Sequence, residues 1–174
     1  MARQFARKLA RAIIIIVLII IILLDAGVAA LTALEYKPAD IEVVPMIGQA
    51  GAEVRTGEPI KLVSWNIGYG ALGDNADFFM DGGTKVYTAD EARVYENMAG
   101  ITEFLKSQNP DIVMPQELDV DSSRSRHIDE TTIVVPALDG AMGGSQYSFA
   151  LNYKAAFVPF PIPPLGKVDR KSVV

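Results

Sequence analysis

The sequence IKLVSWNIGYG at residues 60–70 decides the predicted fold, together with DIVMPQELD at residues 111–119. The first stretch is expected to be a buried strand and the second another apolar strand, and each ends in polar residues. A helix is expected between them over residues 90–107, opened by a capping-box pattern of Thr88 and Glu91. A strand, a helix and a strand in this order normally form a right-handed crossover with the two strands parallel.

Two polar residues stand where these strands are expected to end. Asn66 closes the first apolar run, and Glu117 follows the second. Ligands of open α/β sheets bind at the carboxyl ends of the strands, so Asn66 and Glu117 are candidates for one site. Each residue also has an ordinary explanation, because Asn is a common turn former and a Glu after a strand is commonly solvated or salt-bridged.

A family resemblance strengthens this pairing. SWNIGYG and PQELD, in this order and spacing, resemble the first two motifs of the endonuclease/exonuclease/phosphatase superfamily. The later NYKAAFVPFP is similar to a membrane-anchored bacterial branch of that superfamily. The resemblance covers roughly residues 35–168 and implies an α/β fold, a partial four-layer α/β sandwich preceded by one transmembrane helix.

The resemblance also implies an activity, metal-dependent hydrolysis of a phosphoester by a phosphodiesterase or phosphatase. Asn66 and Glu117 would be catalytic and would lie beside a divalent metal, Mg²⁺ or Mn²⁺. Magnesium prefers oxygen ligands and often takes one or two protein carboxylates, which suits Glu117. Asn66 would orient the phosphate or a water bound to the metal.

The polar segment after the second motif offers three further candidates. Asp119 and Asp121 could support the metal ligands by hydrogen bonding. Arg124 could bind phosphate, because a guanidinium matches phosphate oxygens with a fork of donors.

The same segment has a purely structural interpretation. Ser122 or Ser123 would cap a helix running to about Leu138, with the arginines in solvent. His127 is expected on that helix as an ordinary surface residue. The general acid or base His of the family belongs to a later motif, so His127 is not a candidate for that role.

The N-terminus carries the clearest physical signal. Residues 12–34 are apolar apart from Asp25, and these 23 residues span ~34 Å as a helix against a hydrocarbon core of ~30 Å. Four basic residues and no acidic ones precede the run, which predicts a cytoplasmic N-terminus. Residues 1–34 are therefore expected to be a basic stub and an uncleaved, single-pass signal anchor in the cell membrane. The alternative is a signal peptide cleaved near Ala30, which would release a secreted protein.

The remaining chain divides by composition. Residues 35–58, with several prolines and glycines, are expected to form an extracytoplasmic linker that includes at most a short edge strand. Residues 59–168 are expected to be the N-terminal half of the phosphoesterase domain. Residues 169–174, DRKSVV, match the translation of a sequencing adapter and are interpreted as an artefact. The chain is thus expected to be an inactive fragment, whose missing C-terminal half would be its partner and would carry the general base and acid.

Two further stretches have open interpretations. The Gly- and Asp-rich residues 71–87 lack the ligand pattern of an EF-hand, so a solvated loop is favoured over a calcium site. The proline-rich residues 157–164, FVPFPIPP, are expected to be an extended apolar loop. This loop would touch lipid, shape the substrate cleft or pack against the rim of the sheet.

Composition limits the substrate and the ligands. The chain has no Cys and one His, which excludes disulfides, thiolate metal sites and His-rich metal sites within it. Residues 35–168 contain 10 Lys and Arg against 19 Asp and Glu, a net charge of −9. Nucleic-acid binding usually needs a basic surface, so a lipid headgroup or a small phosphoester is favoured as substrate. The alternative function is a membrane-tethered binding module that uses the same fold without catalysis.

Overall fold

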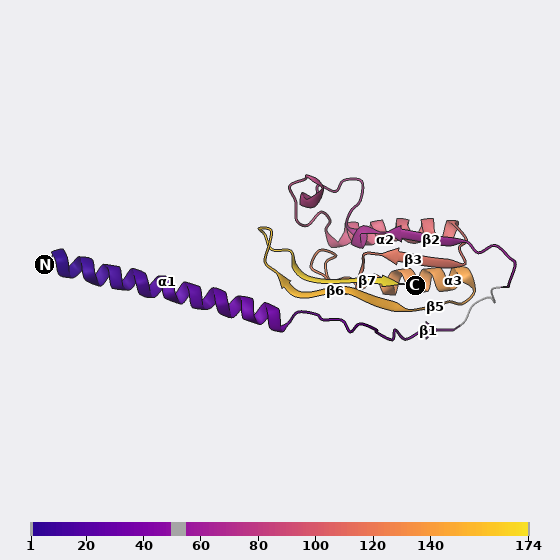
Figure 1. Ribbon diagram of the computed structural model, residues 1–174. Helices are drawn as coiled ribbons and strands as arrows, with labels where there is room; N and C mark the ends of the chain where they lie inside the picture. The colour runs from indigo at the N-terminus through magenta and orange to yellow at the C-terminus, as the bar shows by residue number, and fades with distance from the viewer. Residues whose placement is uncertain (1, 50–54, 174) are drawn as a thin grey trace. The chain divides into compact units, whose positions relative to one another are not determined.

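The computed structural model describes residues 2–49 and 55–173, and the chain divides into two units, Met1–Glu35 and Tyr36–Val174. The first unit is α1 (Ala2–Ala33), one continuous helix (Figure 1). Its stretch Arg3–Ala33 is long and apolar enough to cross a membrane, and none of its most apolar part is buried. The expected apolar N-terminal helix is therefore confirmed, and a membrane span and a signal sequence both agree with it.

The second unit is a mixed α/β structure, which confirms the predicted fold class at that level. Its helices α2 and α3 contact each other, and its strands form three small sheets. The elements in chain order are β1 (Ile47–Gly48), β2 (Leu62–Asn66), η1 (Gly68–Gly70), η2 (Phe79–Asp81), α2 (Glu91–Ser107), β3 (Ile112–Gln116), β4 (Leu118–Asp119), α3 (Thr131–Met142), β5 (Gln146–Tyr147), β6 (Phe149–Val158) and β7 (Gly166–Val173).

The two motif strands pair as the sequence predicts. β2 and β3 are parallel, and Asn66 lies opposite Gln116 at the end of the pair. Hydrogen bonds continue beyond the strands, because the Ile67 N–H donates to the Gln116 carbonyl at 3.0 Å. The expectation that the first strand is buried was wrong in part: the Leu62 side chain is 51% exposed. Among the described strands β2 pairs only with β3, which leaves its other edge uncovered.

The helix between these strands is confirmed, but its predicted cap is not. Asp90 is the N-cap, and its Oδ1 accepts a hydrogen bond from the Arg93 N–H at 2.9 Å. Thr88 instead donates its hydroxyl to the Ala71 carbonyl at 2.6 Å, so the capping box with Glu91 does not form. An Asp side chain at N-cap satisfies a free N–H of the first turn as well as Thr would.

The apolar face of α2 forms the centre of the core. Val94, Met98 and Leu105 are fully buried, as the helical spacing predicts. They pack in one cluster with Leu118 from β4 and Val134 from α3. Because Leu118 directly follows Glu117, this cluster fixes the chain on the C-terminal side of Glu117.

The helix expected from Ser122 or Ser123 begins later, at Thr131. The Ser122 hydroxyl does not cap a helix, because it accepts from the Asp169 N–H at 2.8 Å and donates to the Asp169 carbonyl at 3.1 Å. His127 consequently lies in a turn and not on a helix, and its φ of +61° is incompatible with continuing one. It is exposed, as expected.

The C-terminal strands form an antiparallel sheet in the order β4–β7–β6. β7 runs across the boundary that the sequence analysis drew after Val168, and Asp169 pairs with Lys154 of β6. β1, within the expected linker, pairs with β5, which agrees with the short edge strand allowed there. Of the expected apolar loop, residues 157 and 158 belong to β6, and residues 159–165 form the turn to β7.

Candidate functional site

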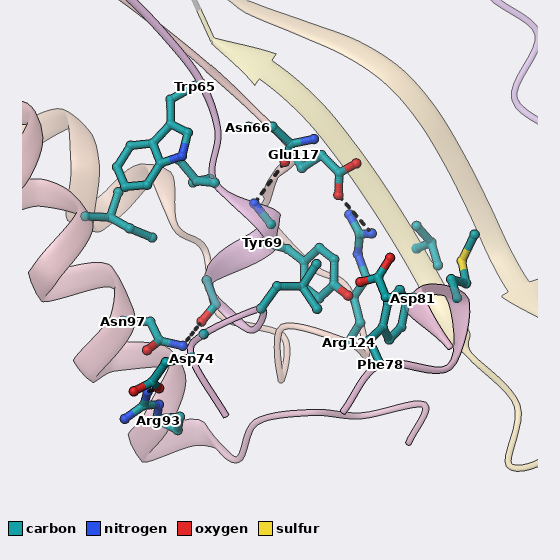
Figure 2. A pocket seen from close by; sticks show the side chains of 18 of the residues that line it. Trp65, Asn66, Tyr69, Asp74, Phe78, Asp81, Arg93, Asn97, Glu117 and Arg124 are labelled. Atoms are coloured by element: carbon teal, nitrogen blue, oxygen red, sulfur yellow. Dashed lines mark hydrogen bonds and ion pairs between the residues drawn. The ribbon is translucent and has the colours of Figure 1, made fainter. Parts of the chain in front are cut away.

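A cavity of about 910 Å³ lies at the carboxyl ends of β2 and β3 (Figure 2). Asn66, Glu117 and Arg124 line it, together with residues of η1, α2 and the loop after the first motif. The structure therefore brings together the two residues that the sequence proposes as catalytic, and adds one of the three supporting candidates.

A tight turn positions Asn66. Its Oδ1 accepts a hydrogen bond from the Gly68 N–H at 3.0 Å. Gly68, Tyr69 and Gly70 all have φ between +46° and +60°, a conformation that glycine adopts readily. Gly70 has a φ of +60°, and a Cβ there would lie 2.8 Å from the Met98 Sδ, so a larger residue would be strained and would displace the Met98 side chain. The glycines of the first motif thus allow the tight turn that lines the cavity.

Glu117 occupies a strained backbone position between β3 and β4. Its φ is +55°, a left-handed conformation that costs roughly 1–2 kcal/mol for a residue with a Cβ. The Glu117 carbonyl accepts from the Tyr69 N–H at 2.8 Å, which ties the turn of the first motif directly to the second. The Glu117 side chain is 20% exposed. Such strain at a cavity residue is typical of functional positions.

Arg124 is a buried cation beside Glu117. Its Nε and Nη2 donate to the two carboxylate oxygens of Asp119, both at 2.8 Å, and its Nη1 lies 3.6 Å from the Glu117 Oε2. The guanidinium carbon lies 3.8 Å from the centre of the Tyr69 ring. Burial alone would lower the pKa of Arg124, but its hydrogen bonds to Asp119 and the negative charge of that carboxylate outweigh burial and raise the pKa above its ordinary value. Arg124 is therefore a fixed positive charge at the cavity.

The other two supporting candidates lie away from the cavity wall. Asp119 is completely buried, and its carboxylate forms an ion pair with the Arg124 guanidinium. Asp121 does not line the cavity; it binds the Lys167 ammonium group and lies 2.6 Å from the Nδ1 of His127. The hydrogen bond from Lys167, followed by that of His127, lowers the pKa of Asp121. Asp121 and His127 thus form a surface ion-pair group separate from the site.

Sequence reasoning missed several residues that shape the cavity. Tyr69, Asn97 and Asp81 all line it, and the Asn97 Nδ2 donates to the Gly70 carbonyl at 2.8 Å. Asp81 lies in the Gly- and Asp-rich loop, where the residue types alone suggested only a solvated loop or a calcium site. Tyr69 stands within the first motif, but nothing in the sequence shows that its ring would lie against Arg124.

Glu130 was also missed, and it is the most perturbed carboxyl group in the described chain. It is completely buried, and its Oε2 accepts from the Asp119 N–H at 2.9 Å. Burial raises the pKa of Glu130 to about 9, so the group is protonated at neutral pH. The sequence Asp129-Glu130 looks like an ordinary acidic helix start, so no local signal marks it.

The donor set at the cavity can be compared with the needs of a divalent cation. Across residues 2–49 and 55–173, no group of three or more Asp, Glu, His or Cys side chains is placed to hold a metal. Glu117 offers a carboxylate at the cavity, and the Asn66 Oδ1 already accepts one hydrogen bond, which leaves it one lone pair. A magnesium ion held by these donors would keep most of its coordination sphere as water.

Comparison with known proteins gives no assignment. No protein-family model matches the chain, and neither a curated protein nor a solved structure is significantly similar to it.

Proposed function

We propose that residues 36–173 form the metal- and phosphate-binding part of a phosphoester hydrolase site that α1 anchors in the cell membrane, with the N-terminus in the cytoplasm. The observation that supports this most is that Asn66 and Glu117 line one cavity from the ends of adjacent parallel strands, beside the buried charge of Arg124. The four-layer sandwich that the two motifs resemble is part of this proposal.

Each residue has a distinct role in the proposed site. Glu117 would hold Mg²⁺ or Mn²⁺, which when bound supplies positive charge against the phosphate oxygens. Asn66, whose Oδ1 accepts a hydrogen bond from the Gly68 N–H, would donate its amide N–H groups to a phosphate oxygen. Arg124 adds a second positive charge, and Asp119 fixes its position through the bidentate pair.

We expect this chain alone to bind the cation but to be inactive. His127 is paired with Asp121 away from the cavity. The Tyr69 hydroxyl is buried, and burial raises its pKa well above the ordinary value, which makes it a poor proton donor. General acid–base catalysis is typically worth ~10²–10⁴-fold, and we propose that residues outside this chain supply it.

The charge of the unit favours a small or lipid-borne phosphoester as substrate. Residues 35–168 carry a net charge of −9, which would repel a polyanionic nucleic acid. A single phosphate group that reaches Arg124 and a bound cation avoids most of this repulsion.

A second candidate function is a membrane-tethered binding module without catalysis. One contact favours it: the Arg124 Nη1 lies 3.6 Å from the Glu117 Oε2, so a resident cation already neutralises the carboxylate that a metal would need. In that case Arg124 and Glu117 would simply stabilise the cavity wall.

Manganese binding separates the two functions. We would measure Mn²⁺ binding to the full chain in nanodiscs by electron paramagnetic resonance, and compare Glu117→Gln with Glu96→Gln. Glu96 lines the same cavity but pairs with Arg93, so it is a matched control. We expect Glu117→Gln to lower the affinity for Mn²⁺ by more than the ~10–100-fold that is typical of removing a supporting residue. Glu96→Gln should bind Mn²⁺ as the unmodified chain does.

A parallel assay addresses turnover. With Mn²⁺ present, we expect no hydrolysis of a chromogenic phosphodiester above the rate in buffer. Equal Mn²⁺ binding by the Glu117→Gln variant and the unmodified chain would rule out the metal site and leave the binding module.

A further inference from the structure

The turn between β6 and β7 presents large apolar side chains to solvent. Ile162 is 90% exposed and Phe160 is 71% exposed, and Phe157 at the end of β6 is 45% exposed. Figure 1 shows this turn as the tip of the β6–β7 hairpin. Clustered exposed side chains of this size commonly mark a surface that another phase or molecule covers.

The composition of the tip suits a lipid phase. Between Lys154 and Lys167 the chain has no charged residue, and four of the seven residues at 159–165 are prolines. Proline has no N–H, so such a turn loses fewer hydrogen bonds to water when it enters an apolar medium. A bilayer interior supplies no acceptor for a backbone N–H, whereas a partner protein can, so the shortage of donors lowers the cost of insertion most for lipid.

The turn adjoins the wall of the cavity. Val158 and Leu165, the residues at the two ends of the turn, line the same cavity as Glu117. Met80, from the loop after the first motif, lines it as well and is 71% exposed. A surface that covers the tip would therefore lie next to residues that line the cavity.

The chain itself brings this unit to a bilayer. Thirteen residues separate the end of α1 at Ala33 from the start of β1 at Ile47, and they can span at most ~45 Å. A short tether of this kind raises the effective concentration of a weak membrane contact. The net charge of −9 over residues 35–168 argues against a contact based on attraction to anionic lipids, so the contact should be apolar.

We propose that residues 159–165 dock on the surface of the bilayer that holds α1, with Phe160 and Ile162 inserted among the lipid chains. The cavity then opens at the level of the headgroups, where a lipid-borne phosphate can enter without leaving the membrane. This inference rests on the membrane location in the proposed function and is independent of metal binding and catalysis.

A spin label tests the docking. Because the chain has no Cys, Ile162→Cys gives one labelling site in the full chain, reconstituted in phosphatidylcholine vesicles. The measurement is the collision rate of the nitroxide with oxygen, which concentrates in lipid, and with a water-soluble nickel chelate. We expect high oxygen and low nickel accessibility, which corresponds to a depth of roughly 5–10 Å below the headgroup boundary.

Two controls make the result interpretable. Glu103→Cys, on the exposed face of α2, should show the opposite pattern. Ile19→Cys, within α1, reports separately whether that helix is in the bilayer. Adding Phe160→Ser to the Ile162 label should return its nickel accessibility toward that of the Glu103 label, and Phe160 is too exposed for the change to disturb the core.

Three outcomes would overturn the proposal. If the Ile19 label is in lipid while the Ile162 label is as open to nickel as the Glu103 label, the tip does not dock. If the Ile162 label is shielded from both reagents, protein covers it, as in an association between copies. If the Ile19 label is itself in water, the membrane location fails together with this inference, whereas Mn²⁺ binding still tests the catalytic proposal.

Discussion

Glu130 is a single residue on which the arrangement of the cavity depends, although it does not line the cavity. It accepts from the Asp119 N–H, Asp119 holds Arg124 by two hydrogen bonds, and Arg124 lies beside Glu117. The Glu130 Oε1 has no hydrogen-bond partner among the described residues. Ionising this carboxyl group would place an uncompensated charge in the core, which is strongly unfavourable.

The stability of the protein should therefore fall as the pH rises. The pKa of Glu130 is about 9 in the folded chain and 4.5 in its ordinary state, so between these values the folded state binds more protons than the unfolded state. The free energy of unfolding then decreases with increasing pH, by at most ~1.4 kcal/mol per pH unit from this group. Glu130→Gln keeps an acceptor for the Asp119 N–H and cannot ionise, so urea unfolding at several pH values should give a flatter dependence.

Glu103→Gln is the matched control for this prediction, because Glu103 is an exposed carboxylate on α2. It should leave the slope of stability against pH unchanged. Identical slopes for Glu130→Gln and the unmodified chain would mean that Glu130 is ionised in the folded state.

At the scale of elements, the start of α2 is capped by the hydrogen bond of one side chain. The Asp90 Oδ1 accepts from the Arg93 N–H, and no second capping bond from Thr88 supports it. We expect Asp90→Ala to lower the free energy of unfolding by about 1 kcal/mol, and Asp90→Asn, which retains an acceptor oxygen, to cost much less. Thermal unfolding of the two variants measures the difference. An equal decrease in the free energy of unfolding for Asp90→Ala and Asp90→Asn would show that the charge of Asp90, rather than its hydrogen bond, stabilises the helix.

The elements that the sequence predicted correctly are those whose signals are local. The apolar spacing of Val94, Met98 and Leu105 defines α2, and the two apolar runs around it define the parallel pair β2–β3. The cap and the start of α3 were predicted wrongly because Thr88 and Ser122 have distant partners. Ser122 binds Asp169, which lies 47 residues away, and no sequence window can show that competition.

The same distinction applies to the site. Asn66 and Glu117 could be placed together because they stand at the carboxyl ends of two strands whose pairing was predictable. The bidentate pair between Arg124 and Asp119, and the separation of Asp121 from the cavity, arise at and after the end of β4, before α3 begins at Thr131, where no apolar periodicity predicts the course of the chain.

At the scale of the whole molecule, the proposed anchor makes a prediction about topology. Four basic residues precede the apolar part of α1, so we expect the N-terminus to stay in the cytoplasm and residues 36–173 to lie outside. Protease added to intact spheroplasts should then digest this unit, while a tag at the N-terminus stays protected until the membrane is disrupted. A soluble mature protein beginning near Ala30 would instead identify α1 as a cleaved signal peptide.

Trp65 gives the molecule one further property. It is the single tryptophan in the sequence, it lines the cavity, and its ring packs edge-on against Phe104 at 5.1 Å between centroids. All of the intrinsic ultraviolet emission that comes from tryptophan therefore originates beside Asn66. We expect the wavelength and intensity of this emission to change when a molecule enters the cavity, even when no chemical product is formed.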